Sequence, residues 1–151
     1  MKKIIVAAML LHFTLPFQGI AQEYGDLLSL LVSEEYEKVV KKAEKYTTND
    51  KTKKDPLPYL YMSEAMYRMS LDNKYKDTYP KAYKTALSYA AKFRKKDKGN
   101  AYGEESVDYF EELKLVIAEE VENYMDENTE KSMKKGLGLM KKVVQFSPED
   151  R

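Results

Sequence analysis

The chain has 151 residues, with 26 Lys and Arg against 25 Asp and Glu, for a net charge of +1. This near-neutral balance gives no electrostatic reason to expect nucleic acid as a partner. Hydrophobic residues make up 43% of the sequence, which excludes wholesale disorder. The sequence has no Cys, and its single His is His12. Beyond the N-terminal segment, the composition therefore excludes Cys nucleophiles, His bases, disulfides and Cys/His zinc sites, and we expect no cofactor and no metal site.

Residues 1–21 have the layout of a secretory signal peptide. Two lysines precede an apolar run from Ile4 to Leu11, and the small residues Gly19 and Ala21 stand just before Gln22. The run is too short to span about 30 Å of hydrocarbon. We therefore expect an exported protein, periplasmic or extracellular, with no integral membrane segment. Because the sequence lacks Cys, we do not expect a lipoprotein.

Residues 22–151 are expected to be all-α, because apolar residues recur at helical spacing in six segments and no segment alternates with period two. The predicted apolar faces are Tyr24, Leu27, Leu28 and Leu31; Tyr36, Val39, Val40, Ala43 and Tyr46; Leu57 to Met69; Ala82, Ala86, Tyr89, Ala90 and Phe93; Phe110, Leu113, Ile117, Val121 and Tyr124; and Met133, Leu137, Met140 and Val144.

Polar, Pro and Gly residues predict where these helices begin and end. Ser33 is expected to cap the second helix and Asp55-Pro56 to begin the third. Gly99-Asn100 is expected to end the fourth helix, Asn128-Thr129 to cap the sixth, and Ser147-Pro148 to end it. The third helix is apolar on two sides, which is typical of a helix packed between two others.

An internal repeat links the second and fourth helices. Residues Tyr36–Tyr46 and Tyr79–Tyr89 share Tyr, Lys, Ala and Tyr in register, 43 residues apart, and the segment from Met133 fits the same pattern more loosely. A pattern of this length at a fixed interval indicates an array of helical repeats.

The repeat resembles the tetratricopeptide repeat (TPR) family. Residues that match the pattern of the family are Tyr59, Met62, Ser63, Ala65, Met66, Tyr67 and Ser70 in the third helix and Gly136, Met140, Val143 and Pro148 in and after the sixth. The resemblance implies three helix-turn-helix pairs stacked as a short TPR-like α-solenoid over residues 22–151. The intervals of 43 and 54 residues between units are longer than the usual unit of the family.

The resemblance also implies a binding surface. In this family the first helix of each pair lines a concave groove, and its signature residues point into the core. On the third helix this leaves Leu60, Glu64, Tyr67 and Arg68 as the predicted peptide-binding residues. The alternative is that Glu64 and Arg68 form an ordinary exposed pair four residues apart.

Two blocks of charge lie next to each other in the sequence. Residues 74–98 hold nine Lys and Arg against two Asp, and residues 104–127 hold ten Asp and Glu against one Lys. A surface for anionic polymers is one interpretation of the basic block, and two partly solvated neighbouring helices of opposite charge are the other. The carboxylates of Glu111-Glu112 and Glu119-Glu120 could serve a glycosidase or a cation site, but solvated acids on a helix are far commoner.

We therefore expect an exported, non-enzymatic helical-repeat scaffold that binds a protein or peptide in the cell envelope. The alternatives are an envelope carbohydrate-binding or hydrolysing protein that uses the acidic helix 104–127, and a structural fragment of a larger repeat assembly. Nothing in the sequence follows the sixth helix to cover Leu137, Met140, Val144 and Phe146. Either the array is incomplete or this helix supports weak self-association.

The signal-peptide layout of residues 1–21 predicts that this segment is cleaved off. When the full chain is expressed with an active export pathway, N-terminal sequencing and intact mass should place the mature terminus at or near Gln22, in the exported fraction. A soluble cytoplasmic product that retains residues 1–21 would contradict the prediction.

Overall fold

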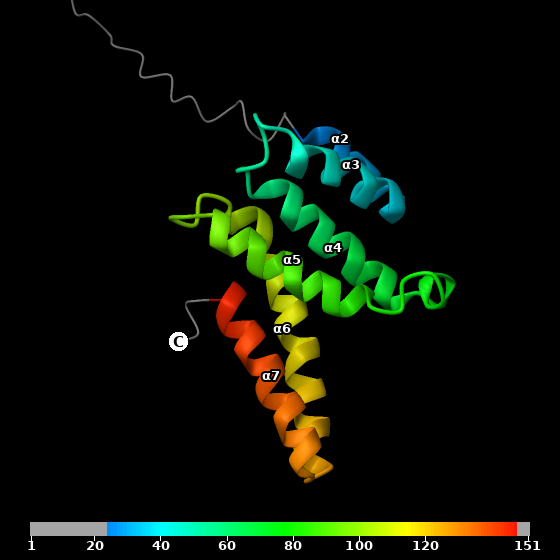
Figure 1. The fold of residues 1–151 in the computed structure, drawn as a ribbon, viewed down its shortest axis with the longest axis vertical. Helices are drawn as coiled ribbons and strands as arrows, with labels where there is room; N and C mark the ends of the chain where they lie inside the picture. Colours follow the sequence, from blue (N-terminus) through cyan, green and yellow to red (C-terminus); the bar gives the residue numbers. More distant parts are fainter. Residues whose placement is uncertain (1–23, 148–151) are drawn as a thin grey trace, which may run out of the picture.

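The computed structural model describes residues 24–147 (Figure 1), and the predicted leader lies outside this range. The described residues form six α-helices and one short 3-10 helix, without a strand, so the all-α prediction is confirmed. The elements are α2 (Gly25–Val32), α3 (Tyr36–Thr48), α4 (Leu57–Leu71), η1 (Asn73–Tyr75), α5 (Ala82–Lys96), α6 (Gly103–Asp126) and α7 (Glu130–Phe146). No helix in this part of the chain combines the length and apolarity needed to cross a bilayer.

Most of the predicted boundaries agree with the structure. Thr129 caps α7 by accepting from the backbone N–H of Ser132 at 3.0 Å, and the Ser132 hydroxyl accepts in return from the N–H of Thr129. Gly99 and Asn100 both have left-handed backbone angles, three residues after α5 ends. The expectation for Ser33 was wrong, because its N–H donates back to carbonyls of α2 and so closes that helix, while α3 follows Glu35 without a side-chain cap.

Helix α4 lies between α3 and α5, as its two-sided apolar pattern predicted. Ten of its 15 residues are buried. Burial on both sides explains why α4 carries apolar and small residues almost throughout, with only a narrow polar strip left on its surface.

Helices α6 and α7 form a hairpin that projects from the α2–α5 stack (Figure 1). Near the stack, the Phe110 ring of α6 lies 5.7 Å from Phe93 of α5 and 5.2 Å from Phe146 of α7. The last α6 side chain in the core is Ile117, and beyond it the hairpin is held mainly by α6 and α7 themselves. The base of the hairpin is therefore part of the core, and its far end is not.

Arg94 of α5 fixes this base. Its Nε donates to the carbonyl oxygen of Phe146 at 2.7 Å, and its guanidinium lies 4.9 Å from the centre of the Phe110 ring. The Asp97 carboxylate lies 3.6 Å from Arg94 and accepts from the backbone N–H of Ala101 at 2.9 Å. One cation thus ties together the C-terminus of α7, the α5–α6 loop and the aromatic core.

Two equivalent positions of the predicted repeat are buried in both α3 and α5. Val39 and Ala43 of α3 are fully buried, and Ala82 and Ala86, each 43 residues later, are buried as well. Helix α7 follows this pattern at Gly136, which is buried against Val121 and Tyr124 of α6, and departs from it at Met140, which is 51% exposed. A small residue is needed at position 136 because the two helices approach closely.

The outer apolar residues of α7 are exposed, as the predicted open end requires. Leu137 and Met140 are 56% and 51% exposed, and Val144 is 38% exposed. The expectation for Phe146 was wrong, because its ring stacks on Phe110 and is fully buried. α7 packs instead through Gly136, Leu139, Val143 and Phe146, which form the neighbouring face of the helix.

A buried polar contact links α4, α5 and α6. The Ser63 hydroxyl donates to the carbonyl oxygen of Ala86 at 2.8 Å and lies 2.7 Å from the Tyr109 hydroxyl. Because the Ser63 hydrogen is used in the bond to Ala86, Tyr109 donates to Ser63. Both side chains are buried, so the Tyr109 hydroxyl depends on Ser63 as its acceptor.

Replacing Ser63 should destabilise the fold. Ser63→Ala leaves the Tyr109 hydroxyl buried without an acceptor, which costs about 1–3 kcal/mol of unfolding free energy, measured by urea denaturation. The control is Ser88→Ala, at a half-buried position whose hydroxyl donates to the Lys84 carbonyl of the same helix, and a change near zero is expected. The double variant Ser63→Ala/Tyr109→Phe should lose less than the sum of its single variants, and strict additivity would contradict the assigned pair.

Candidate functional site

The polar strip of α4 lies where this helix meets α6. Glu64 and Arg68, one turn apart, are the only charged residues of α4, and both are partly exposed. The positions next to them, Ser63, Ala65, Tyr67 and Met69, are buried in the core. The site is therefore formed from two α4 side chains and from the acids that α6 presents to them.

Arg68 makes the main contacts at this site. Its Nη1 and Nη2 donate to Oε1 and Oε2 of Glu112, each at 2.7 Å, in a bidentate pair. Its Nη2 also lies 3.5 Å from Oε1 of Glu64. The Tyr67 hydroxyl donates to Oε1 of Glu112 at 3.1 Å, and the Arg68 guanidinium lies 5.4 Å from the centre of the Tyr67 ring.

Burial sets the protonation equilibria of this cluster. Burial raises the pKa of Glu64 above its ordinary value, and the charge of Arg68 only partly opposes the shift. Burial and the Glu112 carboxylate raise the pKa of Tyr67 to about 12. Two carboxylates share one guanidinium, so the remaining charge of the cluster is negative and would favour a cationic group.

The structure separates the four predicted peptide-binding residues. Leu60 and Tyr67 are 2% and 1% exposed, so the expectation that they line an open groove was wrong. Both belong to the core because α4 is covered on two sides and has no free apolar face. Glu64 and Arg68 do reach the surface, and a binding role for them stays a prediction. They form the pair four residues apart that was the alternative, with Glu112 as an added partner.

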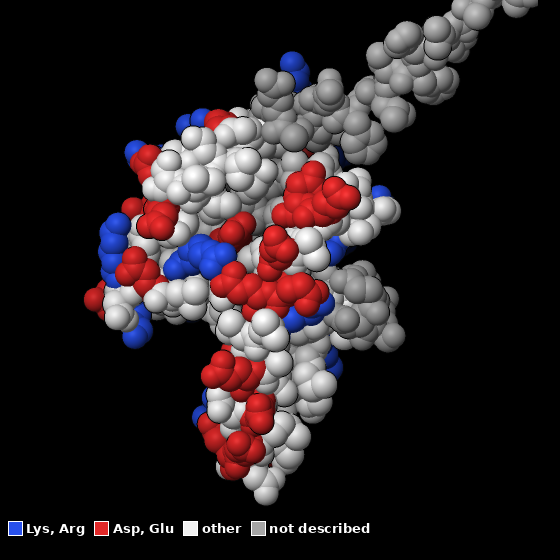
Figure 2. Space-filling model, turned by 180° about the vertical axis from the view of Figure 1, so that it is seen from behind, with Lys and Arg blue, Asp and Glu red and all other residues white. Residues whose placement is uncertain are grey.

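The acids of residues 104–127 lie on α6, except Glu127, which directly follows it. Figure 2 shows acidic side chains gathered over the back of the molecule and along the projecting hairpin. Glu111 and Glu119 are exposed, Glu112 is paired with Arg68, and Glu120 accepts from the Tyr124 hydroxyl at 3.3 Å. Among the described residues, no group of three or more potential metal ligands has the geometry to hold a metal ion.

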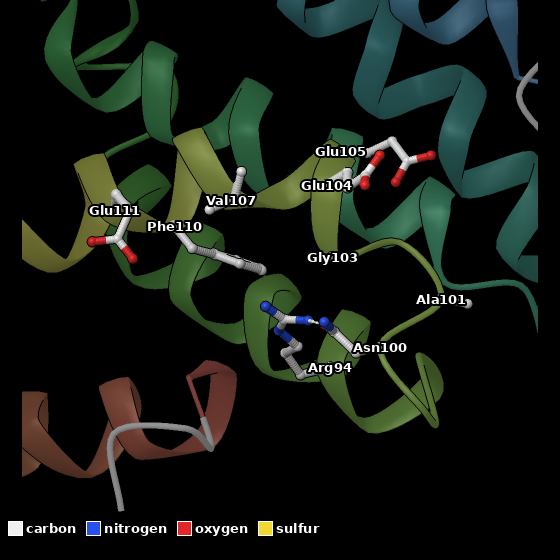
Figure 3. A pocket seen from close by; sticks show the side chains of 9 residues that line it. All are labelled: Arg94, Asn100, Ala101, Gly103, Glu104, Glu105, Val107, Phe110 and Glu111. Atoms are coloured by element: carbon white, nitrogen blue, oxygen red, sulfur yellow. Dashed lines mark hydrogen bonds between the residues drawn. The ribbon is translucent and has the colours of Figure 1, made fainter.

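A cleft of about 770 Å³ lies between the end of α5 and the first turns of α6 (Figure 3). Glu104, Glu105 and Glu111 line it, together with Phe110. The Arg94 guanidinium points into it, but this cation already holds Phe146, Asn100 and Asp97. Arg94 is therefore engaged in contacts that fix the α5–α6 loop. The acids that line the cleft all come from α6, so no carboxylate faces them from a second helix.

A second crevice, of about 420 Å³, lies between α5 and the hairpin. Tyr83, Leu87, Tyr124 and Leu139 supply its aromatic and apolar walls. Lysines from both sides, together with the carboxylate of Glu120, form its polar boundary: Lys84, Lys135 and Lys142. The crevice exists because the hairpin leaves the stack at an angle, so α5 and α7 are in contact along only part of their length.

The hydroxyl of Tyr83 is the unusual group in this crevice. It is buried and, among the described residues, makes no hydrogen bond of ordinary geometry. Burial raises the Tyr83 pKa strongly, and the nearby Glu120 carboxylate adds to the shift. The sequence offered no way to find this crevice, because its walls come from three helices whose relative angle is not encoded in the spacing of any one of them.

Known proteins give no further guidance to the function. Neither protein-family models, nor curated proteins, nor solved structures match this chain.

The raised pKa of Tyr67 predicts alkaline destabilisation. Between its ordinary value near 10 and about 12, the unfolded chain releases this proton before the folded chain does, so the unfolding free energy falls as the pH rises. The contribution is at most about 1.4 kcal/mol per pH unit. Urea unfolding from pH 9 to 12 should show a shallower fall for Tyr67→Phe than for the unchanged chain. Tyr59→Phe, at a half-buried site, is the control; an equal slope in all three proteins would contradict the assignment.

Proposed function

We propose that the protein is an exported, non-enzymatic helical-repeat scaffold that binds a protein or peptide in the cell envelope. The observation that carries the proposal is the crevice between α5 and the hairpin, with apolar walls, a lysine boundary and the buried Tyr83 hydroxyl beside the Glu120 carboxylate. Small concave sites with this mixture of apolar surface and a few polar groups are the usual binding sites of folded domains.

The chemistry of the crevice suggests the kind of peptide. Tyr83, Leu87 and Tyr124 offer surface to one or two apolar side chains, since aromatic residues give large contact area at low entropic cost. Lys84 and Lys142, on opposite sides, favour an acidic residue next to them. An apolar residue beside Asp or Glu is therefore the expected recognition element.

The resemblance to the TPR family supports a scaffold role, and the contacts of α4 support a different location for the site. Glu64 and Arg68 satisfy each other and Glu112, so a ligand there would have to compete with a bidentate ion pair. The Tyr83 crevice requires no such exchange. The non-enzymatic role rests on the lack of His and Cys beyond residue 21, which removes the commonest nucleophiles and bases.

Selection from a random peptide library tests the proposal. The chain should enrich peptides that combine an apolar residue with Asp or Glu. Lys84→Glu should weaken the binding of an enriched peptide about fivefold, measured by isothermal titration, because a favourable charge contact becomes repulsive.

Lys92→Glu is the matched control, because Lys92 is exposed on the same helix but does not line the crevice. Its affinity should stay within about twofold of the unchanged chain. Failure to enrich any peptide, or an equal loss in both lysine variants, would contradict this location of the site.

A further inference from the structure

The projecting hairpin has a second surface, on the side away from α5. Exposed apolar residues gather on it, and no helix among residues 24–147 covers them. We call this surface the outer hairpin face, and its residues are Ala118, Met125, Met133, Leu137, Met140 and Val144.

Contacts within the hairpin place the α7 residues on this face. Gly136 points at α6, where it meets Val121 and Tyr124. Leu139 and Lys142 point towards α5 and line the crevice. The remaining stripe is spaced by four, three and four residues from Met133 to Val144, which places it on one side of α7, away from α5.

Helix α6 extends the same face. Val121 meets α7, and the Ser63–Tyr109 and Arg68–Glu112 contacts turn the opposite side of α6 towards the stack. Ala118 and Met125 precede and follow Val121 by one turn and lie on the side away from the stack. They are therefore continuous with the exposed stripe of α7.

Opposite charges border the two edges of the face. Glu122 lies on the α6 edge together with Glu111, which pairs with Lys114 at 2.6 Å. Lys141 lies on the α7 edge together with Lys134, which pairs with Glu130 of the preceding turn. Glu122 follows Val121, and Lys134 precedes Gly136 by two residues, so both lie near the level where Val121 meets Gly136. The face thus has an apolar centre with one acidic and one basic border.

We propose that the outer hairpin face binds a second copy of this chain. A two-fold axis parallel to the helices would place α6 of each copy on α7 of the other, so that the acidic border of one meets the basic border of the other twice. An axis across the helices would place α6 on α6 and α7 on α7, where like charges meet. Charge pattern therefore selects the first arrangement, a four-helix assembly with an apolar centre.

The size of the face fits a weak dimer. With α7 about 25 Å long and two helices about 20 Å wide, the face covers roughly 500 Å² on each copy. Two such faces reach the lower end of the area found in specific interfaces. A lipid surface is a poorer match, because the acids along α6 would face anionic headgroups.

A charge-swap experiment tests the arrangement. Sedimentation equilibrium of the full chain, purified from the fraction where it accumulates, should show reversible dimers in the micromolar range. Glu122→Lys and Lys134→Glu should each weaken dimerisation at least tenfold, since each places two like-charge contacts in the dimer. An equimolar mixture of the two variants should recover it to within about threefold, because every contact in the mixed dimer is again between opposite charges.

Leu137→Glu should abolish dimers, whereas Leu71→Glu, at an equally exposed leucine outside the face, should not. Circular dichroism checks that each variant stays folded. A chain that is monomeric throughout, or single variants whose mixture does not recover, would overturn the proposal. So would a monomer that binds vesicles of phosphatidylglycerol and phosphatidylethanolamine and loses that binding in Leu137→Glu, because the face would then serve a membrane.

Discussion

The fold depends on the near-complete burial of α4. A helix with ten of 15 residues in the core can present polar groups to water only along one strip, so its few polar side chains must find partners inside the protein. Ser63 finds the carbonyl of Ala86 and the hydroxyl of Tyr109, and Arg68 finds Glu112. Both contacts extend to α6, which is how the central helix determines where the hairpin begins.

The position of the hairpin produces both proposed surfaces. Phe110 and Phe146 anchor its base in the core, and Arg94 holds the end of α7 to α5. Because the far part of the hairpin leaves the stack, α7 has one side turned to α5 across a crevice and another side turned to solvent. The two surfaces lie on different sides of one helix, so a peptide in the crevice would leave the outer hairpin face open.

Helical spacing in the sequence was enough to predict the six helices and the central place of α4. The capping residue Thr129 and the aromatic face of α6 were equally local features, since each depends on residues within a few turns of one helix. The sequence could not show which sides of a helix with two apolar sides are covered by neighbouring helices. Leu60 and Tyr67 were predicted to line a groove because one helix alone does not show what covers it, and in the structure neighbouring helices do.

The sequence was equally unable to show which residues meet at the Arg68–Glu112 site and in the Tyr83 crevice. Arg68 and Glu112 are 44 residues apart, and Tyr83 and Leu139 lie on different helices, so no spacing rule connects either pair. The first pair depends on how α4 crosses α6, and the second on how α5 crosses α7. For α7 the apolar stripe was evident in the sequence, and in the structure Leu137 and Met140 of this stripe are exposed. The second apolar side of α7, which carries Leu139 and Phe146, became evident only from its packing.

The decline of burial along the hairpin has a kinetic consequence. From Ala118 onward, α6 has no fully buried apolar side chain, and the first half of α7 buries only Ser132 and Gly136. Opening this tip breaks few core contacts, so its amides should exchange with solvent through small local openings while those of α4 exchange only when the whole domain unfolds. The tip is thus a separate cooperative unit of low stability. A molecule that binds it would slow hydrogen exchange of its amides without altering that of the α2–α5 stack.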